Sequence, residues 1–101
     1  MQFDHVSVGK KANVYFDGKC VSHTVTLADG TRKSVGVILP STLRFDLSTR
    51  EVMEVVDGTA YVCINGGAEQ TFAAGQSWTV EAGGYFVIRA ALPVHYVCHF
   101  D

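Results

Sequence analysis

The sequence predicts an all-β domain, a small antiparallel barrel or jelly roll with essentially no helix. Apolar and polar residues alternate with a period of two rather than the 3.6 of a helix. Turn-forming residues interrupt the apolar runs at intervals of about 8 to 12 residues, the spacing typical of antiparallel sandwiches and barrels. No window shows a helical pattern, so the core must form between sheets.

The first predicted strand is 20–27, where β-branched residues alternate with polar ones. It leads into Asp29-Gly30, and an apolar run follows at 35–39. Later strands are predicted at 51–56, 59–64, 70–72, 77–80, 85–90 and 94–100. In all, the pattern amounts to about nine or ten short strands. Because Asp and Gly tolerate positive φ, tight turns are predicted at Asp29-Gly30 and Asp57-Gly58.

Length and composition indicate a single domain over residues 1–101. The chain is 48% apolar, enough for one modest core. Eight Lys and Arg stand against ten Asp and Glu, so a nucleic acid polymer is not expected as a partner. The longest apolar run, 35–39, is far below the ~20 residues of a membrane-spanning helix, so no membrane partner is expected either. Residues 1–5 show no signal-peptide pattern, and a cytoplasmic location is expected.

The three cysteines favour neither a disulfide framework nor a zinc site. Cys20, Cys63 and Cys98 are odd in number, widely spaced and without a CxxC pair. All three fall in apolar strand-like segments. We therefore predict buried, reduced thiols.

Small β-barrels of the cupin type carry two metal-binding motifs, and the second half of this chain keeps the frame of both. In the first, G-x5-H-x-H-x3,4-E-x6-G, Glu51 and Gly58 keep the E-x6-G spacing, whereas 43–48 contain no His. In the second, G-x5-P-x-G-x2-H-x3-N, Gly75 and Gly83 are kept and Phe86 replaces the His.

Those replacements argue against a bound metal. A mononuclear site needs about three or four N or O ligands, and the frame retains Glu51 alone. Two of the four His, His95 and His99, would point to one face of a strand roughly 13 Å apart, too far to share a metal. A metal-dependent cupin with unorthodox ligands is left as a weaker alternative.

Several segments together resemble one family of very small cupins. They are Asn-Val-Tyr-Phe-Asp-Gly at 13–18, Ser-Val-Gly-Val at 34–37 and Glu-Val-Met-Glu-Val-Val-Asp-Gly at 51–58. In this order and spacing, from about residue 13 to residue 101, the chain resembles the pyrimidine/purine nucleoside phosphorylases. The resemblance implies a homodimeric pentosyltransferase without a metal or other cofactor. It would cleave purine and pyrimidine nucleosides with inorganic phosphate, giving the free base and ribose 1-phosphate.

Phosphorolysis makes physical demands that can be assigned to residues. Cleavage of an N-glycosidic bond builds positive charge on the ribose, which a nearby carboxylate stabilises. Glu51 is the carboxylate that the motif directs into the barrel, so it is the candidate catalytic residue; alternatively it is an exposed strand residue. Met53, Phe86 and Tyr96 are candidate walls for the base. Core filling is the alternative for Met53 and Phe86.

Phosphate needs cations, hydroxyls or backbone N–H groups. Ser34 and Arg44 are the main candidates, with Lys33, Arg50 and Arg89 as further cations. Strand alternation weakens Arg44 and Arg89, because their neighbours are expected to face the core.

The chain differs from the family pattern around the expected pocket. It has Ser41-Thr42-Leu43 for Gly-Glu-aromatic, Leu47 for a Thr, and Glu81 and Gly84 for a Pro and a Ser. These differences motivate an alternative function, a non-enzymatic cupin that binds a small sugar or nucleoside-like metabolite. A homodimer is also expected because edge strands need covering, although the edge, the preferred base and the phosphate ligands are left open.

Overall fold

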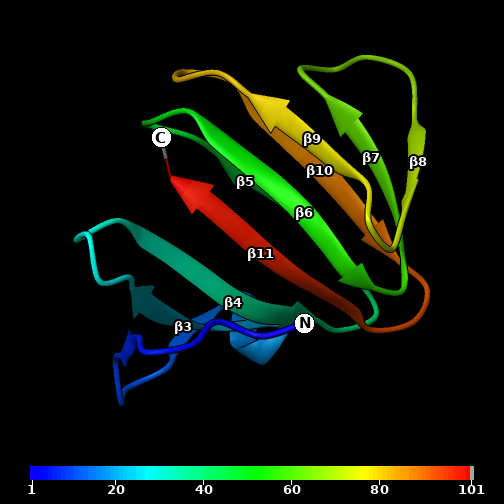
Figure 1. Cartoon of the computed structure of the whole chain (residues 1–101). Helices are drawn as coiled ribbons and strands as arrows, with labels where there is room; N and C mark the ends of the chain where they lie inside the picture. Colours follow the sequence, from blue (N-terminus) through cyan, green and yellow to red (C-terminus); the bar gives the residue numbers. More distant parts are fainter. Residues whose placement is uncertain (101) are drawn as a thin grey trace.

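The computed structural model describes residues 1–100 and confirms the all-β fold (Figure 1). Its elements are β1 (Ser7–Val8), β2 (Asn13–Tyr15), a 3-10 turn η1 (Phe16–Gly18), β3 (Cys20–Thr26), β4 (Arg32–Ile38), β5 (Ser41–Asp46), β6 (Glu51–Asp57), β7 (Thr59–Ile64), β8 (Gln70–Ala73), β9 (Ser77–Val80), β10 (Tyr85–Ala90) and β11 (Val94–Phe100). β1, β2, η1 and β5 were not among the predicted elements.

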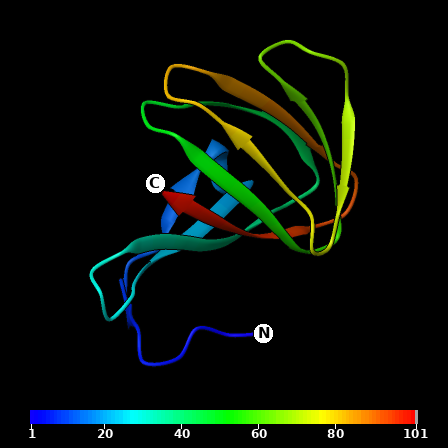
Figure 2. The same cartoon turned by 45° about the horizontal axis from the view of Figure 1, so that its top comes forward.

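The strands form two antiparallel sheets. The larger has seven strands in the order β1-β3-β4-β11-β6-β9, with β2 also paired to β3. The smaller has the order β5-β10-β7-β8; in the first view β5 and β10 lie behind β6 and β9, and β7 and β8 lie to the right (Figure 1). The turned view shows both sheets curving around a common interior (Figure 2). The last strand, β11, lies at the centre of the larger sheet between β4 and β6.

The core lies between the sheets because each strand gives alternate residues to it. On β10, Phe86 and Ile88 are buried whereas Arg89 is exposed, as strand alternation predicted. The buried cluster draws on both sheets, including Met53, Val55, Val62, Trp78, Phe86, Ile88 and Val94.

The tight turn predicted at Asp29-Gly30 is confirmed. The Gly30 N–H donates to the Leu27 carbonyl, and the Thr31 N–H donates to the Asp29 carboxylate at 2.8 Å. Gly30 has φ +88°, a conformation that favours glycine. This turn joins β3 to β4, which pair with each other.

At Asp57-Gly58, where a tight turn was predicted, the chain bends sharply, but the two strands that flank the bend do not pair as a hairpin. Asp57 pairs with His95 in the larger sheet, whereas Thr59 pairs with Ala73 in the smaller one, so the chain changes sheets here. Gly58 makes this corner with φ +94°, and a Cβ would lie 2.6 Å from the Pro93 carbonyl oxygen. The Asp-Gly signal marked a backbone bend but not the partner of the strand that follows.

Burial of the cysteines is confirmed for two of the three. Cys20 and Cys98 are buried, and Cys63 on β7 is half-buried. All three are free thiols. Within residues 1–100, no helix is both long and apolar enough to cross a membrane.

Candidate active site

A cavity of about 510 Å³ opens between the sheets, a volume in the usual range for small-molecule sites. All six predicted site residues line it: Ser34, Arg44, Glu51, Met53, Phe86 and Tyr96. The sequence reasoning did not name the other lining residues as site residues: Tyr15, Phe16, Ser22, Phe45, Asp46, Cys98 and Phe100.

Glu51 is the first residue of β6, and one of its two carboxylate oxygens accepts a hydrogen bond. The Cys98 thiol on β11 donates a hydrogen bond to Glu51 Oε1, with Sγ 3.0 Å away. Burial raises the pKa of Cys98, and the Glu51 carboxylate raises it further, so the thiol stays protonated and remains a donor. Within residues 1–100 the second oxygen, Oε2, has no hydrogen-bond partner, which leaves it available to a ligand.

Tyr96 reaches the cavity floor across Gly36 of β4. A Cβ at Gly36 would lie 2.9 Å from the Tyr96 hydroxyl and 2.6 Å from the Val21 carbonyl oxygen, so only glycine fits. The hydroxyl lies 3.4 Å from the Cys20 sulfur. Burial and this contact raise the pKa of Tyr96, which keeps the phenol neutral.

The two buried serines at the cavity differ in what they offer a ligand. Ser22 accepts a hydrogen bond from the Asn13 side chain at 3.4 Å. The Ser34 hydroxyl has no partner among the described residues. Ser34 can therefore donate to a bound oxyanion without breaking an existing hydrogen bond.

Arg44 lies at the rim of the cavity. Its guanidinium is 3.0 Å from Asp46 Oδ1 and 4.0 Å from the centre of the Tyr85 ring. It is the one Lys or Arg among the described residues that line this cavity. The other predicted cations lie elsewhere: Lys33 contacts His99, Arg50 contacts Glu81 and Arg89 contacts Glu69.

The model of the Pyrimidine/purine nucleoside phosphorylase family matches residues 10–100. The chain belongs to this family. A protein of that name from Thiobacillus denitrificans is 61% identical over 101 residues, covering 98% of this chain and 97% of the relative. One from Dechloromonas aromatica is 58% identical over 100 residues, with coverages of 98% and 97%.

Solved structures agree on the fold. A crystal structure from Acinetobacter, described as a protein of unknown function, is 45% identical with a TM-score of 0.96, covering 99% of this chain and 98% of that one. An RmlC-like cupin from Shewanella frigidimarina is 15% identical with a TM-score of 0.73, covering 98% and 91%. At that identity the second likeness shows the fold alone, and it confirms the cupin-like barrel.

The differences from the family pattern lie mostly beside the cavity rather than in it. Leu47, which replaces a Thr, is buried in the core and does not line the cavity. At Gly84, which replaces a Ser, a Cβ would lie 2.8 Å from Asn65 Oδ1, so this loop accepts only glycine without a shift. Glu81 contacts Arg50 outside the cavity. Ser41, Thr42 and Leu43 do not line the cavity either, although their strand continues to the lining residues Arg44, Phe45 and Asp46.

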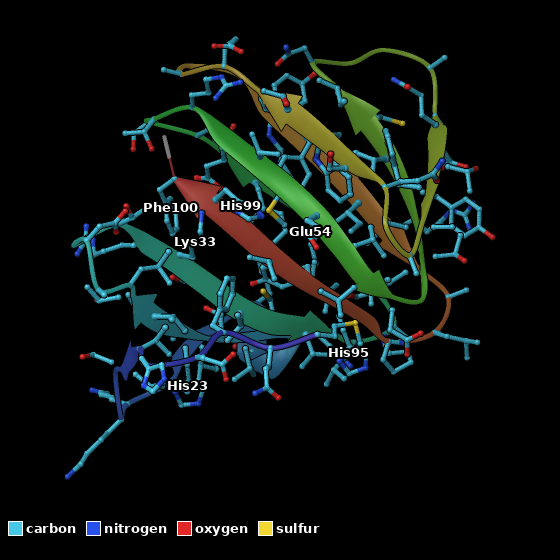
Figure 3. The ribbon with its side chains drawn as sticks, viewed as in Figure 1. His23, Lys33, Glu54, His95, His99 and Phe100 are labelled. Atoms are coloured by element: carbon cyan, nitrogen blue, oxygen red, sulfur yellow. The ribbon has the colours of Figure 1, made fainter. Side chains whose placement is uncertain are left out.

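The histidines lie away from the cavity. On β11, Tyr96, Cys98 and Phe100 line it, whereas His95 and His99 point to the opposite face (Figure 3). There the Lys33 ammonium donates to His99 Nδ1 at 2.7 Å, and His99 Nε2 donates to Glu54 at 2.9 Å. Within residues 1–100, no three His, Cys, Asp or Glu side chains are grouped to hold a metal.

A second cavity, of about 580 Å³, lies on this opposite face beneath the N-terminal residues. Its lining is mostly apolar, and its acidic and imidazole side chains are those of Glu54, His95 and His99. Of the six predicted site residues it contains Tyr96 alone. The smaller cavity is therefore the candidate active site.

Proposed function

We propose that this chain is a nucleoside phosphorylase, which cleaves purine and pyrimidine nucleosides with inorganic phosphate. The observation that carries the proposal is a carboxylate, Glu51, inside a cavity of nucleoside size in a member of this family, with one oxygen that has no hydrogen-bond partner among residues 1–100. Hydroxyl, cationic and aromatic groups surround that carboxylate, as the reaction requires.

In the proposed reaction a phosphate oxygen bonds to C1′ of the ribose while the bond from C1′ to the base nitrogen breaks. The electron pair of that bond leaves with the base, which takes up the proton carried by hydrogen phosphate. The products are the free base and ribose 1-phosphate. Positive charge develops on the ribose during cleavage, and a fixed carboxylate stabilises it electrostatically.

Each predicted residue has a role that its position supports. Glu51 Oε2 accepts from the ribose hydroxyls, and the Ser34 hydroxyl and Arg44 guanidinium bind phosphate. The Tyr96 ring contributes to the cavity wall, and the more deeply buried Met53 and Phe86 back it. Inorganic phosphate is the co-substrate, and neither a metal nor an organic cofactor takes part.

The direct test is base release from uridine, inosine and adenosine, with and without phosphate and in the presence of EDTA. Phosphate-dependent release that EDTA does not reduce is expected. The absence of phosphate-dependent release from every nucleoside would contradict the proposal. Thermal stabilisation by nucleosides without turnover would instead support the alternative, a binding protein.

Glu51→Gln tests the catalytic carboxylate, with Glu54→Gln as a matched control. Glu54 lies on the same strand but faces the opposite side, where it contacts His99. We expect Glu51→Gln to lower kcat on the order of 100-fold with little change in the thermal midpoint, and Glu54→Gln to leave kcat unchanged. A loss of folding in Glu51→Gln would make this residue structural.

We also propose that the chain acts as a homodimer in the cytoplasm. β1 and β2 expose large apolar side chains, Val8, Val14 and Tyr15, which a second copy would cover. Free thiols suit a reducing compartment. Sedimentation equilibrium should give twice the chain mass, and Val14→Lys should shift the equilibrium toward monomer. A monomer throughout the micromolar range would contradict the dimer, and cell fractionation tests the location.

A further inference from the structure

The turn η1 has an unusual backbone. Phe16, Asp17 and Gly18 follow one another with φ of +53°, +53° and +88°. Glycine adopts this left-handed region freely and Asp tolerates it, but a bulky residue such as Phe adopts it at a steric cost. Phe16 is therefore held in a strained conformation.

The surrounding strands impose this conformation. Tyr15 and Cys20 pair across the end of the β2–β3 hairpin, which leaves only four residues for the connection. The Lys19 N–H donates to the Phe16 carbonyl at 3.1 Å, and the Lys19 carbonyl accepts from Leu39 at 2.8 Å. Strained residues cluster at functional sites, where the strain fixes a side chain in place.

The side chain that is fixed here lines the candidate active site. The Phe16 ring meets the Phe45 ring edge-on, with centroids 5.2 Å apart and planes at 75°. Yet Phe16 is 43% exposed, so this contact covers only part of the ring. The strained backbone therefore gives Phe16 little packing against the core, and it leaves much of the aromatic ring exposed at the cavity.

The predicted aromatic wall, Phe86, offers no such surface. Its ring stacks on Phe45 at 5.1 Å and meets Trp78 edge-on at 5.5 Å, and the residue is 1% exposed. Phe86 supports Phe45 from behind, and Phe45 in turn supports Phe16. All three rings line the cavity, and Phe16, at the end of the row, is the most exposed of them.

We propose that the nucleobase stacks on Phe16 and that this contact sets the base tolerance of the site; the inference rests on the proposed function. Stacking uses the π-face that every base has, so it does not distinguish bases by their hydrogen-bonding edges. A ring presented by a rigid, strained turn would therefore accept purines and pyrimidines alike, with a stronger contact for the larger purine.

The test compares Phe16→Leu, Phe16→Trp and Phe16→Gly with wild type, using inosine, uridine and phosphate as variable substrates. Phe16→Leu removes the ring and should raise the KM for inosine about tenfold and that for uridine by less, at unchanged phosphate KM. Phe16→Trp retains stacking and should keep both nucleoside KM values near wild type. Phe3→Leu, an exposed Phe outside this cavity, is the matched control and should change neither.

Phe16→Gly separates binding from folding. Because glycine removes the strain, its thermal midpoint should equal or exceed that of wild type while its nucleoside KM rises as in Phe16→Leu. Nucleoside KM values within twofold of wild type in Phe16→Leu would overturn the inference, as would an effect on phosphate KM or on oligomeric state alone. Lack of wild-type turnover would instead overturn the proposed function, and nucleoside binding measured by calorimetry would then test the stacking contact separately.

Discussion

The hydrogen bond between Cys98 and Glu51 determines how the candidate catalytic carboxylate is presented. This hydrogen bond, with Sγ and Oε1 3.0 Å apart, links the neighbouring strands β11 and β6. The thiol occupies Oε1, and within residues 1–100 Oε2 is the carboxylate oxygen without a hydrogen-bond partner. We therefore expect loss of this contact to lower kcat.

Replacing Cys98 tests this expectation. Cys98→Val removes the donor at similar volume and should lower kcat about tenfold, since hydrogen bonds to charged groups are among the stronger ones. Cys98→Ser retains a donor and should recover most of kcat, and neither change should move the phosphate KM. Equal activity in the Val and Ser variants would show that the thiol serves packing only.

Residue by residue, the sequence located the site better than it assigned roles within it. All six predicted residues line one cavity, among them Glu51 from the E-x6-G spacing and Phe86 from the second motif. Arg44 also lines it, although strand alternation argued against this residue. Cys98 and Phe100 could have been found from the same alternation, since they follow Tyr96 at steps of two. Phe16 could not, because its place depends on a left-handed backbone that no periodicity reveals.

At the scale of elements, strands with clear alternation were predicted within a few residues, as for β3, β6, β7, β10 and β11. β1 and β2 were missed because two or three residues are too few to show a period. The corner at Gly58 shows a different limit of the sequence pattern. An Asp-Gly pair reports the local φ that a bend needs, whereas the pairing of the next strand depends on residues far away in the sequence.

The whole molecule buries several groups in their neutral, protonated forms, and this makes its stability depend on pH. Burial raises the pKa of the Cys20, Cys98 and Tyr96 side chains above ordinary values of 9.0 for thiols and 10.0 for tyrosine. Above these values the unfolded chain loses protons that the folded chain keeps, so the free energy of unfolding falls as pH rises. Below about pH 8 the contribution is fully present.

Urea unfolding at about pH 7, 9 and 10.5 checks this sign. The midpoint should be highest at the lowest of these pH values and fall steadily at the other two. Cys98→Ser provides the control, because a serine hydroxyl does not ionise in this range, and its midpoint should fall less steeply. A urea midpoint that stays constant to the highest pH would contradict the inference that the folded chain keeps Cys20, Tyr96 and Cys98 protonated.

The central position of β11 has a consequence for how the chain acquires its fold during synthesis. A nascent chain that has emerged only as far as β10 contains β4 and β6 as two separate sheet edges, since β11 is the strand that joins them. The same strand brings Tyr96, Cys98 and Phe100 to the cavity. Contacts of such long sequence separation form late. Until then the growing chain exposes open strand edges with which other chains can pair. We therefore expect this fold to be most prone to aggregation during its synthesis, before β11 has emerged.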